Sequence, residues 1–146
     1  MCHIASHEGV KVDPKKIKSI KEWKFPTTIK QLRGFIRLAG YYRKFVKNYG
    51  RIVAPLTTLL KKDAFSWTRE ATKAFEHLKE AMYLAPVLAT LDFTKTFIVE
   101  CDASVNGIGV VLMQEGRPIA FESHSLKGKY YRNPFMRRKC WKSYMH

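Results

Sequence analysis

The sequence predicts an α+β fold, in which an N-terminal helical bundle is followed by an antiparallel meander of about three strands. Before residue 86, apolar side chains recur every three or four positions, which is the period of amphipathic helices. After residue 95, short β-branched and aromatic runs alternate with turn-forming residues. With 46% hydrophobic residues among 146, the chain is globular rather than disordered.

The first helix is expected in the stretch DPKKIKSIKEW, where Ile17, Ile20 and Trp23 are three positions apart. Pro14 is suited to begin this helix, because the first helical residue needs no partner for its N–H group. Pro26 is expected to close it.

The second helix is expected across residues 26–50, with Thr27 or Thr28 as its N-cap and Gly50 as its stop. At about 100° per residue, one side of this helix is apolar and consists of Leu32, Phe35, Ala39, Tyr42, Phe45 and Val46. An arc of about 100° on the opposite side holds Lys30, Arg33, Arg37, Gly40, Lys44 and Lys47. A glycine inside a helix costs roughly 1 kcal/mol relative to alanine. Gly40 therefore indicates either a surface that another molecule approaches closely or neutral drift.

Two more helices are expected before the strands begin. The stretch RIVAPLTTLL forms the first of them and begins before Pro55. The strongest helical pattern covers residues 66–86, where Thr68 is a suitable N-cap and Pro86 ends the helix. Its apolar stripe consists of Ala71, Ala74, Phe75, Leu78 and Met82.

Strands are expected in residues 94–101, 107–114 and 117–126, and their short links indicate a meander. The boundary between helices and strands is expected near residues 86 to 95. Asp102 follows the first run directly, where a glycine-containing turn is expected to begin. An acid in this position is typical either of a metal ligand or of a turn.

The net charge of +15 is unevenly distributed. Residues 11–62 hold 15 lysines and arginines against Asp13 and Glu22, whereas residues 63–126 hold five basic and nine acidic residues. Residues 127–146 add seven basic residues and no acid. Such local excess favours a polyanionic partner, of which nucleic acid is the obvious case, although a solvated basic face is the alternative.

Several classes of protein are disfavoured by the sequence. No apolar stretch approaches the roughly 20 residues of a membrane span, and the start lacks the apolar core of a signal peptide. Cys2, Cys101 and Cys140 share no metal-binding spacing and cannot all pair, so we expect an intracellular, reducing compartment. The sequence predicts no membrane partner, and no small-molecule substrate is evident in it.

Several motifs, in order and spacing, resemble the polymerase polyprotein of Ty3/gypsy-type LTR retrotransposons over about residues 3 to 128. They are KVDPKKIKSIKEW, LRGFIRLAGYYRKFVKNYGRIVAPLTTLLKK, FSWTREATKAFEHLKEAM, APVL and FIVECDASVNGIGVVLMQEGRPIAFES. The resemblance implies four segments: the end of the primer-grip segment in 1–12, a helical thumb/connection-like domain in 13–86, a truncated ribonuclease H-like domain in 87–128 and a basic tail in 129–146. The parent family is both an RNA-directed DNA polymerase and a ribonuclease H, but the resemblance places the polymerase aspartates upstream of residue 1.

The resemblance also implies a role for the cationic arc. In the family, the thumb helix lies along the minor groove of the template–primer duplex, so Lys30, Arg33, Lys44 and Lys47 are expected to contact phosphates, which position a duplex without reading its sequence. The family usually has glycine in place of Arg37, where a small residue permits close approach. Arg37 adds charge and takes up that room.

Asp102 matches the first of several family carboxylates that hold two divalent ions, usually Mg²⁺, for cutting the RNA strand of an RNA–DNA hybrid. Hard cations need several oxygen ligands at one site. After Asp102 the chain has only Glu115 and Glu122 as acids. We therefore expect Asp102 to be a vestigial part of an incomplete metal site that binds no Mg²⁺ stably.

The tail differs from the family motif of the type Y-E-K-E-[LM]-L-A-I, which carries the second catalytic acid. The chain has NPFMRRKCWKSYMH instead. A shift of one nucleotide in the codons of residues 135–146, with both arginines as AGR, allows Y-E-K-E-M-L-E-I-L-H-A. We infer a frameshift just before residue 134 that replaced the catalytic helix with an out-of-frame basic tail.

Three functions follow as hypotheses. The first is a degenerate, catalytically inactive retrotransposon fragment that binds duplex or hybrid nucleic acid without regard to sequence. The second is retained ribonuclease H activity as part of a reverse transcriptase, which the missing acids oppose. The third is a helical DNA-binding regulator built on residues 28–60, which would need base-reading side chains rather than a row of cations.

Overall fold

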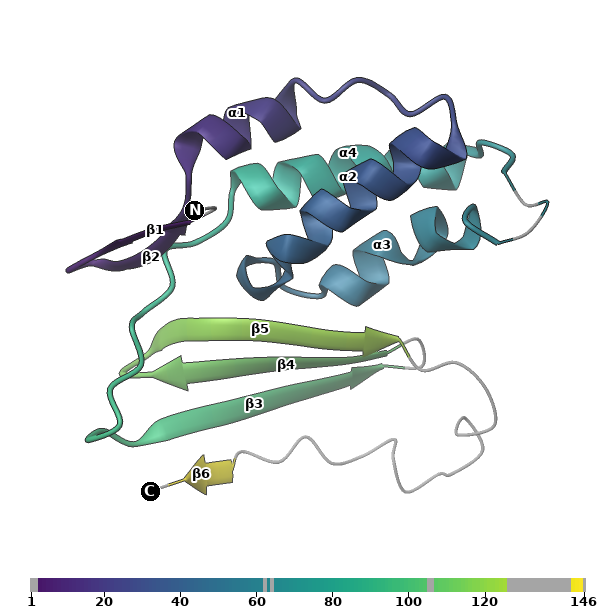
Figure 1. Cartoon of the computed structure of the whole chain (residues 1–146). Helices are drawn as coiled ribbons and strands as arrows, with labels where there is room; N and C mark the ends of the chain where they lie inside the picture. Colours follow the sequence, from purple (N-terminus) through teal and green to yellow (C-terminus); the bar gives the residue numbers. More distant parts are fainter. Residues whose placement is uncertain (1–2, 62, 64, 105–106, 126–142, 146) are drawn as a thin grey trace.

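The structure, a computed structural model, describes residues 3–61, 63, 65–104, 107–125 and 143–145. Its elements follow the order β1 (His3–Ser6), β2 (Gly9–Val12), α1 (Pro14–Lys21), α2 (Ile29–Tyr41), the 3₁₀ turn η1 (Arg43–Phe45), α3 (Tyr49–Thr58), α4 (Arg69–Tyr83), β3 (Phe97–Ser104), β4 (Gly107–Gln114), β5 (Arg117–Ser125) and β6 (Ser143–Met145). Helices gather on one side of a four-stranded sheet, with the β1–β2 hairpin at one end (Figure 1). This confirms the predicted α+β fold. No helix among the described residues has the length and apolar character to cross a membrane.

The predicted helix starts are confirmed. Asp13 caps α1 by accepting a hydrogen bond from the Lys15 amide, and Pro14 is the first helical residue. Thr28 caps α2, and Thr68 caps α4 by accepting from the amide of Ala71 at 3.2 Å. Each cap satisfies an amide that lacks a partner inside the helix.

The predicted end of the second helix is wrong. Helix α2 ends at Tyr41, and Gly50 lies inside α3 rather than after a long helix. The cause is packing: Phe45 and Val46 are both buried, and the chain turns through η1 to bring them into the core. Asn48, whose backbone is left-handed with φ of 57°, then reverses the chain into α3. The first helix likewise ends at Lys21, five residues before Pro26.

The helical bundle contains the main hydrophobic core. Its largest fully buried side chains include three phenylalanines and one tyrosine, namely Phe35, Tyr42, Phe45 and Phe75. Trp23 and Trp67 pack at its edge as partly buried aromatics. The apolar residues predicted on one side of the second helix are all buried, although three of them, Tyr42, Phe45 and Val46, come from beyond α2.

The three-strand meander is also confirmed. Strands β3, β4 and β5 pair in antiparallel order, and the Glu115–Gly116 turn between β4 and β5 has positive φ at both residues, as tight hairpins require. Strand β6 pairs with residues 97–99 of β3, a pairing the sequence did not predict. The rest of the predicted out-of-frame tail lies outside the described residues.

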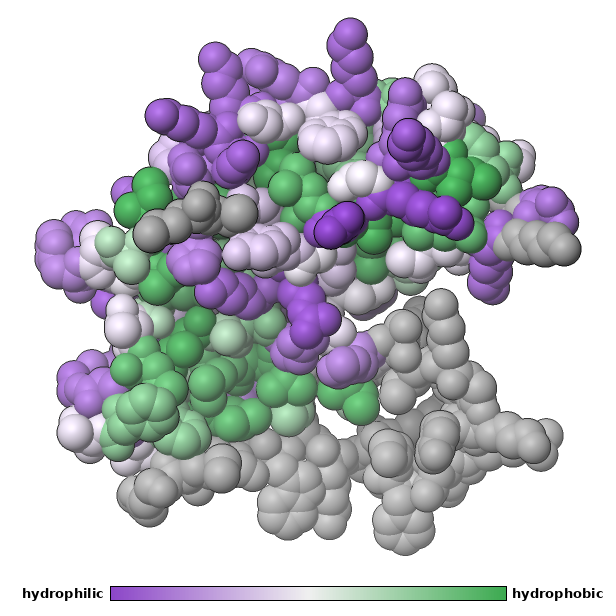
Figure 2. Space-filling model, in the orientation of Figure 1, coloured by the Kyte–Doolittle hydropathy of each residue, from purple (hydrophilic) through white to green (hydrophobic). Residues whose placement is uncertain are grey.

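The sheet is far less buried than the helices. Among the described residues of β3, β4 and β5, only Gln114 is fully buried, and the apolar residues are half-buried except for the exposed Ala103. Figure 2 shows mostly hydrophobic surface over the strands, below a more hydrophilic helical part. The helices meet the sheet through α3 and η1, which contact β5.

Candidate functional site

Three cations form an exposed face on α2. Lys30, Arg33 and Arg37 are three and four residues apart, so they share one side of the helix. All three are exposed, and none forms an ion pair with a residue that the structure describes. We call these residues the α2 cationic face.

The other predicted contacts lie elsewhere. Because α2 ends at Tyr41, Lys44 belongs to η1 and Lys47 to the segment before α3, so the single row of cations predicted on one helix is wrong. Lys44 is half-buried, with its amino group 5.2 Å from the centre of the Phe45 ring. Lys47 is exposed at the corner between helices and sheet.

Gly40 faces the neighbouring helix. A Cβ atom at Gly40 would lie 3.6 Å from the hydroxyl of Tyr49, an ordinary contact distance. That hydroxyl also lies 3.5 Å from the carbonyl oxygen of Ile36, to which it donates. Burial, opposed by the charge of Arg43, raises the pKa of Tyr49 to about 12. The space beside Gly40 is therefore occupied by α3 of the same chain.

Asp102 lies inside strand β3, which continues to Ser104 rather than ending at Cys101 as predicted. Residues 105 and 106 of the predicted turn are outside the described part of the chain. Asp102 pairs across the ladder with Gly109 of β4 and has an exposed side chain. The missing side chain at Gly109 lets Asn48 come close, since a Cβ there would lie 2.6 Å from the Asn48 amide oxygen.

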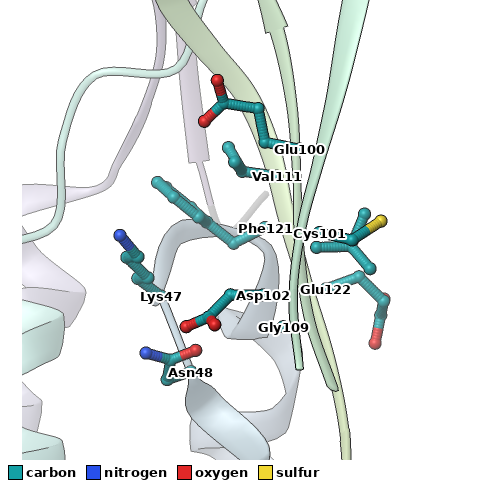
Figure 3. Close-up of a pocket in the computed structure, with 10 residues that line it drawn as sticks. Lys47, Asn48, Glu100, Cys101, Asp102, Gly109, Val111, Phe121 and Glu122 are labelled. Atoms are coloured by element: carbon teal, nitrogen blue, oxygen red, sulfur yellow. The ribbon is translucent and has the colours of Figure 1, made fainter. Parts of the chain in front are cut away.

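Sequence reasoning missed Glu100. It precedes Asp102 by two residues, so the two carboxylates lie on the same face of β3, on the side of Lys47 and Asn48 (Figure 3). The period of a strand is two, and this spacing alone would have found the pair.

The two acids that the sequence did consider lie apart from Asp102. Glu122 of β5 points away from Asp102 (Figure 3), and its carboxylate is 3.3 Å from the guanidinium of Arg43. Glu115 lies at the far end of β4 from Gly109, a separation of roughly 20 Å along the strand. Its carboxylate is 3.0 Å from the amine of Lys95, and this hydrogen bond raises the pKa of Lys95.

The described residues do not fit a pair of divalent ions. Two magnesium ions need several oxygen ligands gathered at one site. In the described ranges, no group of three or more histidine, cysteine, aspartate or glutamate side chains is placed to hold a metal. Asp102 and Glu100 supply two carboxylates, and neither Glu115 nor Glu122 joins them.

The helices and the sheet meet at a corner beside Asp102. The Gly50 amide donates to the hydroxyl of Ser123 at 2.7 Å, and Phe121 packs against the helical core. A cavity of about 500 Å³ lies at this corner and is bordered by Lys47, Asn48, Glu100, Asp102, Val111 and Phe121. Figure 3 shows these side chains on the side of the strands that faces the corner.

A helical bundle joined to a β-meander, with an exposed aspartate on the first strand of the meander, is the arrangement expected where a polymerase thumb joins a ribonuclease H-like domain. The chain belongs to the family of RNase H-like domains found in reverse transcriptase, whose model matches residues 67–142. This confirms the resemblance to gypsy-type polyproteins.

Relatives show the same affiliation. The chain is 43% identical over 126 residues to the retrovirus-related Pol polyprotein from transposon 297 of Drosophila melanogaster, covering 85% of this chain and 12% of that protein. It is 51% identical over 96 residues to an uncharacterised mitochondrial protein of Arabidopsis thaliana, covering 66% of this chain and 61% of that protein. The chain thus corresponds to a small part of the polyprotein.

A solved structure has the same fold. The foamy viral protease-reverse transcriptase in complex with RNA/DNA hybrid superposes with a TM-score of 0.81 and 24% sequence identity. The match covers 90% of this chain and 19% of that one. The likeness confirms the α+β arrangement of helices and sheet.

Proposed function

We propose that this reverse transcriptase/ribonuclease H-like fragment binds duplex or hybrid nucleic acid through the α2 cationic face, without regard to sequence, and does not cut it. The observation that carries the proposal is the exposure of Lys30, Arg33 and Arg37 on one side of a helix, free of acidic partners among the described residues.

Phosphate contact is the chemistry that such a face supplies. Ammonium and guanidinium groups pair with phosphate oxygens, which are the same at every base pair, so affinity is gained without sequence readout. The foamy viral relatives of the same fold are in complex with RNA/DNA hybrid and with double-stranded DNA, which supports a partner of this class. A regulator built on residues 28–60 would instead need side chains that reach base edges.

The absence of cutting is inferred from the small number of carboxylate ligands beside Asp102. Cleavage of an RNA strand by two metals requires both ions to be held against the scissile phosphate. Asp102 and Glu100 are the two carboxylates on that face, and the described residues bring no third. Residues 13–86 would then serve as the thumb/connection-like binding part and residues 87–128 as a ribonuclease H-like part without stable Mg²⁺.

Binding is tested by fluorescence anisotropy with labelled hybrids and DNA duplexes of two unrelated sequences, from 50 to 200 mM salt. We expect equal affinities for both sequences. The triple variant Lys30→Ala/Arg33→Ala/Arg37→Ala should lower the slope of log affinity against log salt by about 2.7, or about 0.9 per lost phosphate contact.

The matched control is Lys15→Ala/Lys16→Ala/Lys73→Ala, which removes the same charge from exposed positions on α1 and α4. It should change the slope by less than about 1, since long-range charge alone acts weakly at these salt concentrations. Equal effects of the two triple variants would show that net charge, rather than the α2 cationic face, determines binding. A strong preference for one sequence would favour the regulator.

Cleavage is tested separately by incubating the full chain with an end-labelled hybrid. The Mg²⁺ concentration is on the order of 5 to 10 mM, which is high enough to saturate weak sites. We expect no cut product. Cutting that Asp102→Ala abolishes would overturn the proposal and establish retained ribonuclease H activity.

A further inference from the structure

The α2 cationic face continues into an exposed aromatic side chain at the end of the helix. Tyr41 is the last residue of α2 and follows Arg37 by four positions, the same spacing that separates Arg37 from Arg33. Residues four apart are neighbours on a helix surface, with about 5–6 Å between their Cβ atoms. Tyr41 is 57% exposed. One side of α2 therefore carries three cations followed by one aromatic ring.

A buried neighbour fixes the position of the Tyr41 ring. The centre of this ring lies 5.6 Å from that of the Tyr42 ring, at an interplanar angle of 72°, which is the edge-to-face arrangement that aromatic pairs prefer. Tyr42 is completely buried in the core of the helical bundle. Because the contact limits the positions of Tyr41, less conformational entropy is lost when this side chain meets a ligand.

The two ends of this side of α2 differ in what they can bind. Lys30, Arg33 and Arg37 lie in the first two thirds of the helix, and the last turn holds no basic residue. The N-terminal end of a helix also attracts anions through its macrodipole, whereas the C-terminal end repels them. Phosphates are therefore favoured beside the cations, and the end with Tyr41 offers a ring instead of a charge.

Cations followed by a ring suit a nucleic acid in which a duplex passes into an unpaired base. Basic side chains track the backbone of single strands, and aromatic side chains stack on their bases. A base inside a duplex is stacked between its neighbours and must leave the stack before a side chain can reach it. The side of α2 from Lys30 to Tyr41 is about 16 Å long, which equals the rise of about five nucleotides of one strand.

We infer that Tyr41 stacks on an unpaired base beside the duplex that the α2 cationic face holds. The chain then prefers a duplex with a single-stranded extension over a blunt duplex. This inference rests on the proposed function, because the three cations hold the duplex. The preference adds no sequence readout, since every base offers an aromatic face.

The test compares three DNA ligands by fluorescence anisotropy with the full chain. The first is a blunt duplex of about 15 base pairs. The second carries an extension of about three thymidines, and the third carries the same extension made of abasic nucleotides. The two extensions have equal charge and differ only in their bases. We expect the thymidine extension to bind about tenfold more tightly than the abasic one, which is the gain that stacking of one base supplies.

Variants show whether the Tyr41 ring recognises the base. Tyr41→Leu should lower the ratio of the two affinities, thymidine over abasic, from about ten to less than about two. Tyr41→Phe should keep the ratio, because the ring remains. Tyr83→Leu is the matched control, because Tyr83 is a tyrosine of similar exposure, 53%, at the end of α4. It should keep the ratio of the parent chain.

Equal affinity of the parent chain for the thymidine and abasic extensions would overturn this inference. If the blunt duplex is still bound, the proposed function stands. Failure to bind any of the three ligands would overturn both. A ratio that Tyr41→Leu keeps, or that Tyr41→Phe or Tyr83→Leu loses, would also overturn the inference, because the Tyr41 ring would then not be the group that recognises the base.

Discussion

Gln114 is a buried polar residue at the end of β4, and its replacement tests how the sheet is attached to the segment that precedes β3. Its side chain is 4% exposed. The amide nitrogen donates to the carbonyl oxygens of Asp92 and Lys95 at 2.8 and 2.9 Å, and the amide oxygen accepts from the Asp92 N–H at 3.0 Å. Three backbone groups of one turn therefore depend on a single side chain.

Gln114→Leu keeps the volume and removes all three hydrogen bonds. Each contributes about 1 kcal/mol net, and the Lys95 carbonyl lies in an exposed turn where water replaces part of the loss. We expect the free energy of unfolding to fall by about 2–3 kcal/mol. This is a large share of the roughly 5–15 kcal/mol that stabilises an ordinary domain.

The measurement is urea unfolding followed by far-ultraviolet circular dichroism, where the midpoint should fall by about 1–2 M. The matched control is Gln31→Leu, because Gln31 accepts from Thr27 at an exposed helix start and should cost less than about 1 kcal/mol. A free energy of unfolding for Gln114→Leu within about 0.5 kcal/mol of the parent value would refute the reasoning, because ordinary surface substitutions change stability by that much.

Three further predictions concern the caps, the hairpin and the buried tyrosine. Thr68→Ala should lower the free energy of unfolding by about 1 kcal/mol and Thr68→Ser by much less, as measured by urea unfolding, because serine keeps the oxygen that accepts from the Ala71 amide. Gly9→Ala should expose the Val10 and Leu88 amides to hydrogen exchange, because Gly9 has φ of 132° and a Cβ there would lie 2.1 Å from the Leu88 carbonyl oxygen. Burial raises the pKa of Tyr49 from 10.0 to about 12, so the unfolded chain releases this proton first, and the stability present below pH 10 is lost as the pH rises toward 12. Tyr49→Phe should reduce that decline in urea unfolding at pH 9 and 11, and an unchanged decline would contradict the assignment.

Local rules in the sequence were enough to predict where the helices start and in which order the strands pair. Asp13, Thr28 and Thr68 act as caps because a short polar side chain satisfies an amide only a few residues away. The end of α2 was not predicted because no residue near Tyr41 in the sequence requires the helix to stop there. The same apolar spacing continues through Phe45 and Val46, and only the position of the core shows that the chain must turn before them.

The candidate site was predicted less completely, for a related reason. The resemblance identified Asp102, and strand periodicity would have added Glu100, because two residues on one strand share a face. Asn48, Gly109 and Ser123 are joined only by docking of the two parts of the chain, and their separation in sequence hides that contact.

The turn after Tyr41 also divides the predicted nucleic-acid contacts by their surroundings. Lys30, Arg33 and Arg37 face solvent on a helix without acids nearby, whereas Lys47 stands at the corner opposite Glu100 and Asp102. A carboxylate that holds no cation repels phosphate, so Asp102 opposes the attraction that Lys47 exerts on a polyanion. In an enzyme that cuts a hybrid, metal ions reverse this local sign and draw the phosphate in. A polyanion that meets this chain is therefore expected to stay on α2, away from Asp102, which matches the first of the family's catalytic carboxylates.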